Sequence, residues 1–256
     1  MRPLSVIITT FNESMNIRET IASVNWADEI IVVDSYSTDG TPDIVRKLGA
    51  RLFERSYSGP ADQKNWAIPQ AKNQWILLLD ADERPSPELV DEIRAVLTDE
   101  ETSQDCFQIT RQNFFLGKKV NYSGWRNDKV VRLIRRDRCR YDDKQVHEEI
   151  ETTGLRVGFL KHKLLHYTFR DSGQYLDKIR RYGEWSALDH LERTPRVTGF
   201  HLFVKPTYRF FKHYVLQRGF LDGQVGLIIS AIMAWGVFLR YVRIKELRTL
   251  EQGSEE

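Results

Sequence analysis

The feature that most constrains the fold is a series of four strand-like runs near the start of the chain, separated by helix-like stretches. The runs are Leu4–Thr10, Glu29–Asp34, Arg51–Glu54 and Trp75–Asp80. The first and last are almost continuously apolar, which is typical of strands buried on both faces of a sheet. Strands alternating with helices are typical of a parallel sheet covered by helices. The sequence therefore predicts an α/β domain.

The pattern changes after Asp99. Cys106–Arg111 and Lys129–Arg135 are strand-like and are joined by long polar loops, which predicts that the sheet becomes mixed. A helical pattern returns from Gly173 to Glu192, and the chain beyond Pro195 is basic and aromatic. We therefore predict an α/β domain over residues 1–195, as the candidate catalytic domain of the motifs described below, and a helical segment over 196–256.

Three of the predicted strands end in polar or acidic side chains. Thr10 ends the first strand and is followed by Asn12 and Glu13, Asp34 ends the second, and Asp80 ends the fourth. A single aspartate at a strand end is explained by its preference for turns. Three such ends in a parallel sheet meet at one edge, where open α/β folds bind their ligands.

The sharpest motif is Asp80-Ala81-Asp82, directly after the apolar run WILLL. Two carboxylates at a strand end can hold a hard divalent cation such as Mg²⁺ or Mn²⁺, with a pyrophosphate completing the coordination shell. The chain has no GxxxxGK[ST] loop and no GxGxxG after the first strand. Kinase and dinucleotide-binding interpretations therefore lose their main support.

Four segments together resemble family 2 glycosyltransferases: residues 4–13 (LSVIITTFNE), 31–41 (IVVDSYSTDGT), 63–67 (QKNWA) and 77–82 (LLLDAD). A closer similarity, through the VHE at 146–148 and the basic C-terminal segment, is to lipopolysaccharide core β-glucosyltransferases. The resemblance implies the GT-A fold, a Rossmann-like, mostly parallel sheet flanked by helices, here with a C-terminal amphipathic segment. It also implies inverting transfer of a hexose, glucose from UDP-glucose, to a lipopolysaccharide core or other lipid-linked glycan.

The resemblance further assigns roles to individual residues. The nucleotide would contact Thr10, Asn12, Glu13, Asp34, Lys64 and Asp80, and the metal ion would be bound by Asp82, Asp80 and His166. Two of these residues have an ordinary structural alternative. Lys64 is either a phosphate-neutralising lysine or a solvated lysine on a helix surface, and His166 is either a metal ligand or a buried structural histidine.

Inverting transfer requires a general base that deprotonates the acceptor hydroxyl. Its position in the VHE motif makes Glu148 the first candidate, with Glu149 and His147 as competitors. The alternative is that these residues form a solvated acidic patch.

The C-terminal segment has an uneven charge. Arg193 to Leu250 contains ten Lys and Arg residues against two acids. We expect amphipathic helices attracted to an anionic membrane surface, or a helical pair that packs on the catalytic domain or a second subunit. Nucleic acid ranks last as a partner because no recognition motif accompanies the charge. The longest uncharged apolar run, Val225–Leu239, is too short to cross a bilayer by itself.

The location follows from several weaker features. Cys106 and Cys139 show no paired spacing, which fits a reducing cytosol, and the N-terminus shows no signal peptide pattern. We therefore expect a cytoplasmic protein, peripheral on the inner face of the cytoplasmic membrane. Two other functions remain open: a nucleotide-sugar-forming nucleotidyltransferase, which usually has a Gly-rich basic loop after its first strand, and a non-catalytic membrane-surface scaffold.

Overall fold

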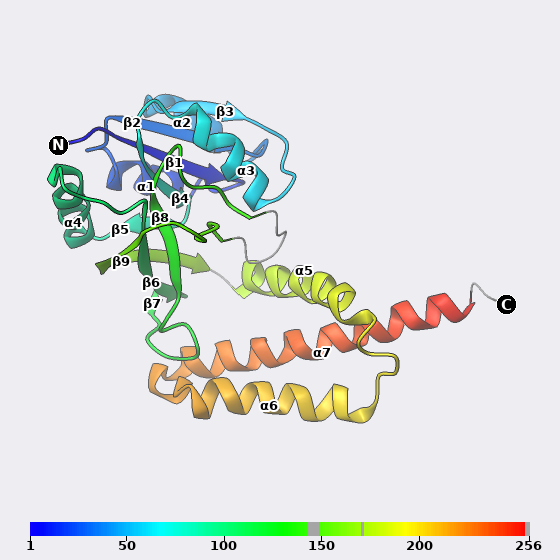
Figure 1. The fold of residues 1–256 in the computed structure, drawn as a ribbon. Coiled ribbons are helices and arrows are strands. Elements are labelled where there is room, and N and C mark those ends of the chain that lie inside the picture. Colours follow the sequence, from blue (N-terminus) through cyan, green and yellow to red (C-terminus); the bar gives the residue numbers. More distant parts are fainter. Residues whose placement is uncertain (143–148, 170–171, 254–256) are drawn as a thin grey trace. The chain divides into compact units, whose positions relative to one another are not determined.

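The computed structural model describes residues 1–142, 149–169 and 172–253 (Figure 1). The chain divides into two compact units. Unit 1 comprises Met1–Gln112 and Asn127–His166, and unit 2 comprises Asn113–Arg126 and Tyr167–Glu256. The division at residue 195, which was inferred from a change in composition, stays a prediction.

Unit 1 begins with the predicted parallel strands, and their bounds match the prediction: β1 (Leu4–Thr10), β2 (Glu29–Asp34), β3 (Arg51–Glu54) and β4 (Trp75–Asp80). β1 lies between β2 and β4 and is parallel to both. The register places Thr10 opposite Asp34, and Thr9 opposite Asp80. The polar strand ends therefore lie at one edge of the sheet, as predicted.

The second half of the sheet is mixed, also as predicted. β8 (Lys129–Arg135) is antiparallel to β4, and β6 (Cys106–Phe115) is antiparallel to β8. β9 (Val157–Phe169) and the short β5 (Glu83–Pro85) form a further antiparallel pair. The strand order is β3-β2-β1-β4-β8-β6-β9-β5, and β7 (Lys118–Lys119) pairs with β6.

Helices and two apolar clusters complete unit 1. The helices are α1 (Ile17–Ser23), α2 (Thr41–Lys47), α3 (Pro60–Ala67) with the 3-10 turn η1 (Ile68–Gln70), and α4 (Pro87–Thr98). Side chains of β1 alternate between the clusters, with Val6 and Ile8 in one and Ile7 in the other. Because successive side chains of a strand point to opposite faces, both faces of β1 are buried.

Unit 2 is helical. Its elements are α5 (Ser172–Leu191), the continuous helical stretch η2 (Phe200–Val204), α6 (Lys205–Phe211) and η3 (Lys212–Leu216), the turn η4 (Gly219–Asp222), and α7 (Gln224–Gly253). α7 packs against both α5 and α6. Asp222 holds residues 121–123 of the same unit: its carboxylate accepts hydrogen bonds from the Asn121 and Tyr122 N–H groups and from the Ser123 hydroxyl, each at 3.0 Å.

The length of α7 corrects one expectation. Residues Gln224–Leu250 form a helix that is long and apolar enough to cross a membrane, judged by length and composition alone. The expectation that this region is too short was wrong because the helix continues past the uncharged run, through Arg240 and Tyr241. Long apolar helices also serve as core helices of proteins in water, so length does not decide the role of α7.

Candidate functional site

The loops after β1 and β2 brace each other. The Asn12 N–H donates to the Ser37 hydroxyl (2.7 Å), and the Thr38 N–H donates to the Asn12 side-chain oxygen (2.8 Å). The Ser14 N–H donates to the Asp39 carboxylate (2.9 Å). Asn12 has a φ of 54°, a left-handed conformation that asparagine tolerates better than most residues. This rim of the sheet edge is therefore fixed by side chains from both loops.

Asp34 and Thr10 lie beneath this rim. Asp34 is fully buried, and its two carboxylate oxygens accept from the Ser37 N–H (2.7 Å) and hydroxyl (2.5 Å). The Thr10 hydroxyl is buried and has no hydrogen-bond partner within the described part of the chain. A buried polar group without a partner costs about 1–3 kcal/mol, so a polar ligand group at this strand end would be stabilised there.

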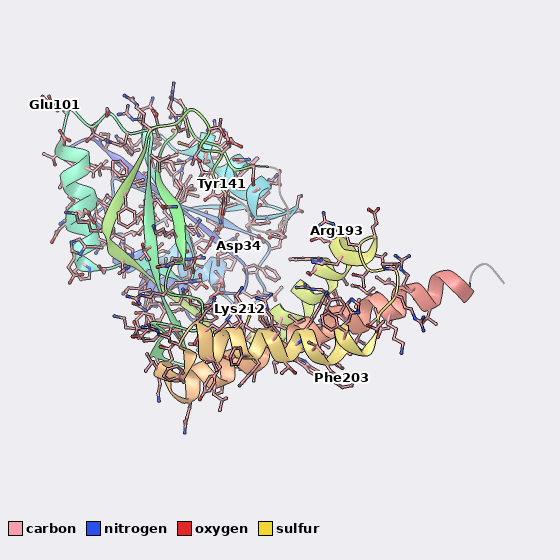
Figure 2. All side chains as sticks on the ribbon, turned by 60° about the horizontal axis from the view of Figure 1, so that its bottom comes forward. Asp34, Glu101, Tyr141, Arg193, Phe203 and Lys212 are labelled. Carbon is pink, nitrogen blue, oxygen red and sulfur yellow. The ribbon has the colours of Figure 1, made fainter. Side chains whose placement is uncertain are left out.

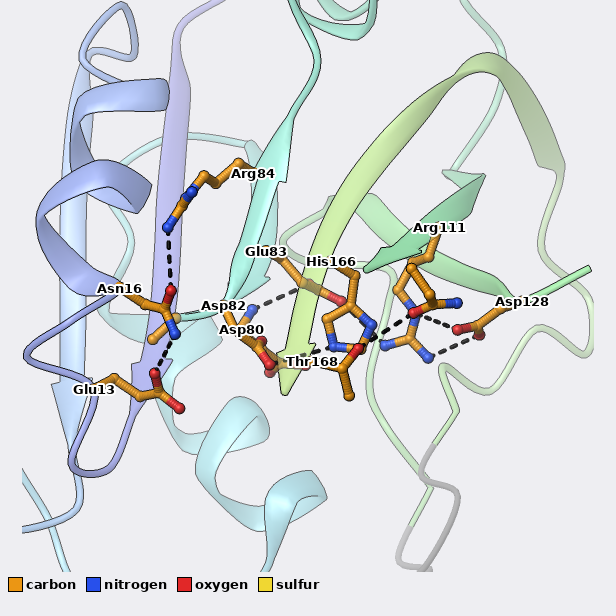
Figure 3. A network of polar contacts seen from close by, with 12 residues as sticks. Glu13, Asn16, Asp80, Asp82, Glu83, Arg84, Arg111, Asp128, His166 and Thr168 are labelled. Carbon is orange, nitrogen blue, oxygen red and sulfur yellow. Dashed lines mark hydrogen bonds and ion pairs between the residues drawn. The ribbon is translucent and has the colours of Figure 1, made fainter. Parts of the chain in front are cut away.

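Glu13 is tied to the start of α1. Its carboxylate accepts from the Asn16 side-chain amide at 2.6 Å, and the Asn16 oxygen accepts from Arg84 at 3.1 Å (Figure 3). These contacts explain how Glu13 is held. The role predicted for it in nucleotide binding stays a prediction.

Asp80 lies between two buried cations. Lys64 of α3 contacts one carboxylate oxygen at 3.0 Å, and Arg132 of β8 contacts the other at 2.7 Å. The Thr9 hydroxyl also donates to Asp80. Burial alone would raise the pKa of Asp80, but the charges of Lys64 and Arg132 outweigh it and hold the pKa well below its ordinary value. Lys64 is therefore a buried charge partner and not a solvated helix lysine.

Glu83 extends this network and was not predicted from the sequence. Its carboxylate is fully buried and accepts from Arg132 (2.9 Å), from Arg111 (3.1 Å) and from the Asp80 N–H (3.1 Å). Arg111 is held in turn by a two-pronged pair with Asp128 (Figure 3). The available signal was an arginine at the centre of KVVRLIR, because a charge inside a buried strand requires a partner.

Asp82 has different surroundings from Asp80. Its carboxylate lies 3.4 Å from Nε2 of His166, which the pairing of β5 with β9 brings alongside (Figure 3). His166 is 7% exposed. Within the described residues, no group of three or more His, Cys, Asp or Glu side chains is placed to hold a metal ion. Asp82 and His166 can therefore supply two ligands, and a diphosphate would have to supply others.

The two carboxylates of the DxD motif thus differ in what they can bind. Both oxygens of Asp80 already face protein cations, and a metal ion placed against them would be repelled by Lys64 and Arg132. Asp82 faces an imidazole, which can coordinate a metal through its neutral form. The metal-binding roles of Asp82, His166 and Asp80 stay predictions, and the surroundings of Asp82 and His166 are compatible with them.

The segment with the candidate bases begins at this network. The Tyr141 hydroxyl accepts from Arg132 at 3.1 Å, and Nζ of Lys64 lies 5.3 Å from the Tyr141 ring centroid. Asn65 exchanges two hydrogen bonds with the Tyr141 backbone. Tyr141 also bridges to Ile150, which closes the other end of the segment.

Of the three candidate bases, Glu149 is exposed, and its backbone pairs with Asp142 across the segment. Glu148 and His147 lie outside the described residues. Their predicted role as general base therefore stays a prediction.

Comparison with known proteins gives a consistent result. Residues 5–160 match the family described as glycosyl transferase family 2. An uncharacterized glycosyltransferase of Rickettsia prowazekii is 30% identical over 99% of this chain and 90% of its own length. The lipopolysaccharide core biosynthesis glycosyltransferase LpsC of Rhizobium meliloti is 28% identical over 93% of both chains.

A solved structure shares the fold. It is the mannosyltransferase PcManGT of Pyrobaculum calidifontis in complex with GDP-Man and Mn²⁺, with a TM-score of 0.54 and 17% identity over 98% of this chain and 88% of that one. The predicted GT-A fold is confirmed. With its family match over more than half of the sequence, the chain belongs to glycosyltransferase family 2.

Proposed function

We propose that this glycosyltransferase moves a hexose, glucose from UDP-glucose, to a lipopolysaccharide core sugar or another lipid-linked glycan. The observation that carries the proposal is the different surroundings of the two DxD carboxylates at the end of β4. Asp80 is held by Lys64 and Arg132, whereas Asp82 faces His166. The LpsC relative supports the acceptor class, and the nucleotide sugar bound to PcManGT supports the donor class. The choice of glucose and uridine rests on the resemblance of the motifs.

The nucleotide would lie along the braced loops at the ends of β1 and β2. Asn12 and Asp34 fix these loops, and the buried Thr10 hydroxyl offers an unused donor and acceptor. Each carboxylate oxygen of Asp34 can accept more than the one hydrogen bond it receives from Ser37, so a base N–H can still be bound there. Glu13 would complete this side of the site.

A bound divalent ion, Mn²⁺ or Mg²⁺, would be held by Asp82 and His166, with Asp80 as a further candidate, and would neutralise the charge of the departing diphosphate. The chain's own residues add to this effect. Lys64 and Arg132 are buried cations beside the end of β4, and Asp80 and Glu83 hold them in fixed positions. Positive charges fixed before the reaction stabilise developing negative charge without rearrangement.

The base would act in a single displacement. As the acceptor oxygen bonds to the anomeric carbon, the bond from that carbon to the phosphate oxygen breaks, and the acceptor proton passes to the base. We assign the base to Glu148, with Glu149 and His147 as alternatives. The link from Arg132 to Tyr141 ties the beginning of this segment to the charges around Asp80.

The proposed place of the reaction is the inner face of the cytoplasmic membrane, with the protein bound peripherally to an anionic surface. A lipid-linked acceptor requires the catalytic unit to work close to a membrane. The basic and apolar helices of unit 2 and the lipopolysaccharide role in the name of the LpsC relative support this location.

Calorimetric titration of UDP, UDP-glucose and GDP-mannose, with Mn²⁺ and then with EDTA, tests the donor site. We expect UDP to bind only with the metal ion, and UDP-glucose to bind more tightly than GDP-mannose. If neither UDP nor UDP-glucose binds under either condition, the proposed donor is wrong.

Glu148→Gln tests the assignment of the base. A general base contributes about 10²- to 10⁴-fold to the rate, so turnover should fall by that factor while UDP affinity is retained. Glu149→Gln is the matched control because the residue adjoins Glu148 and is exposed. If only the control variant loses turnover, the base is Glu149.

A further inference from the structure

The helical stretch formed by η2, α6 and η3 presents apolar side chains to the outside. Four of them recur every three or four residues and so share one face, a fifth adjoins the first of these, and all five are between 41% and 70% exposed. We call this set the outer stripe: Phe203, Val204, Tyr208, Phe211 and Val215. Figure 2 shows Phe203 on the outer side of the helix.

The opposite face of the same stretch carries polar groups. Lys205, Arg209 and His213 follow one another at intervals of four residues and are partly or fully buried. Nζ of Lys205 donates to the Tyr241 hydroxyl of α7 at 2.7 Å. Nδ1 of His213 lies 2.9 Å from the Ser123 carbonyl oxygen, and Arg209 contacts Nε2 of His213 at 3.3 Å.

This arrangement is the reverse of what water favours. A helix on the surface of a protein in water normally turns its apolar stripe inward and its charged residues outward. Inside a bilayer, polar and ionisable groups instead face neighbouring helices, and apolar groups face lipid. The outer stripe is therefore suited to an apolar medium, and α7 of the same unit also exposes the apolar side chains of Leu227, Ile228 and Trp235.

The charge of the flanking sequence indicates which apolar medium is involved. From Arg193 to Leu221 the chain contains six Lys and Arg residues and no Asp or Glu. Arg193, Arg196 and Arg218 are exposed at the two ends of this stretch. Two copies of so basic a surface would repel each other, whereas anionic headgroups would be attracted to it.

We infer that the outer stripe is a docking surface for an anionic phospholipid bilayer, with its aromatic side chains embedded in one leaflet and the flanking arginines among the headgroups. Interfacial helices of proteins are bound in this way, by buried apolar area together with attraction to anionic lipid. The inference rests on the proposed membrane location and specifies the surface that mediates it.

Co-sedimentation of the full-length chain with vesicles tests the inference. The vesicles contain either phosphatidylcholine alone or phosphatidylcholine with phosphatidylglycerol. The test variant is Phe203→Ser combined with Phe211→Ser, and the matched control is Phe159→Ser, because Phe159 is 50% exposed on β9 of unit 1. Calorimetric UDP binding with Mn²⁺ is measured on all three proteins.

We expect the unsubstituted chain and the control to bind the phosphatidylglycerol vesicles, and the double variant to bind them at least about tenfold more weakly, because two phenyl groups no longer leave water. Binding of the double variant equal to that of the unsubstituted chain overturns the inference, and so does failure of the unsubstituted chain to bind either vesicle. A dimer that dissociates in the double variant without a change in vesicle binding assigns the stripe to a second copy instead.

The UDP measurement separates this inference from the proposed donor. If vesicle binding depends on the outer stripe but the protein binds no UDP, the docking surface is supported and the proposed donor is wrong. A second measurement uses a probe within the stripe: brominated phospholipid should quench the tryptophan fluorescence of Phe211→Trp by a larger fraction than that of the unsubstituted chain. Equal quenching in the two proteins contradicts embedding of this surface.

Discussion

The sheet edge of unit 1 and the outer stripe of unit 2 differ in which side chains they bury. The sheet edge buries charged side chains, and the outer stripe exposes apolar ones. Around Asp80 the charged groups are buried and paired, with Arg132 4% exposed and Glu83 fully buried. Along the outer stripe the apolar side chains are exposed, and Lys205, Arg209 and His213 face inward.

The difference shows that each region is arranged for a different surrounding. Buried ion pairs are costly to desolvate, so their value lies in holding charges in fixed positions for a polar ligand. Exposed aromatic side chains gain free energy only when a further apolar phase covers them. Variants in the two regions should therefore respond differently to the same measurement.

The largest effect on stability is expected for Arg132→Met. The substitution leaves Glu83 and Asp80 with one cation fewer, and Glu83 is fully buried. Loss of one partner of a buried ion pair costs about 3–5 kcal/mol in the free energy of unfolding. Urea denaturation measures this cost.

Arg243→Met is the control for that variant, because Arg243 pairs with Glu246 on the surface of α7. An exposed pair of this kind contributes about 0–1 kcal/mol. If the two variants lose equal stability, the charges around Asp80 do not form the buried network described above.

An intermediate effect is expected for Asp82→Ala. Removal of one fixed electrostatic group commonly lowers turnover by about 10²- to 10³-fold, and UDP binding should no longer depend on the metal ion. The melting temperature should fall less than in Arg132→Met, because Asp82 is 19% exposed and its contact with His166 is 3.4 Å long. Asp91→Ala, at a side chain that is 79% exposed on α4, is the control. Full turnover in Asp82→Ala would leave Asp80 as the remaining acidic candidate.

The smallest effect on stability is expected for Phe203→Ser. Phe203 is 70% exposed, so the free energy of unfolding in water should change by less than about 0.5 kcal/mol. Phe115 of the same unit is fully buried beside Tyr175, and Phe115→Ala should cost about 3–5 kcal/mol. Chemical denaturation of both variants compares them. A loss in Phe203→Ser as large as that in Phe115→Ala would mean that protein covers the stripe.

Much of the fold could be predicted because buried parallel strands leave a strong local pattern. The bounds of β1, β2, β3 and β4 follow from short runs between turn residues, and the acids at their ends follow from the direction of the strands. The same reasoning brought Thr10, Asp34 and Asp80 to one edge. Each of these conclusions needed only neighbouring residues and the rule that parallel strands end together.

The rest depended on pairings between distant residues. Arg132 and Glu83 are 49 positions apart, and the order of the antiparallel strands brings them together. The sequence marks Arg132 as unusual without identifying its partner. Likewise, the pattern around Phe203 predicts an amphipathic helix, but only the packing of α6 on α7 shows which face is turned outward.

The discontinuity of unit 2 limits how the protein can be recombined. Residues 121–123 precede β8, yet their backbone and side-chain groups are held by Asp222, about a hundred positions later. Phe115 and Val120 likewise share an apolar cluster with Val225 and Ile229. A chimera that joins residues 1–195 to a foreign membrane anchor would leave residues 113–126 without the contacts that Asp222, Val225 and Ile229 provide. Exchange of anchors among relatives, whether by evolution or by design, must therefore carry both pieces together.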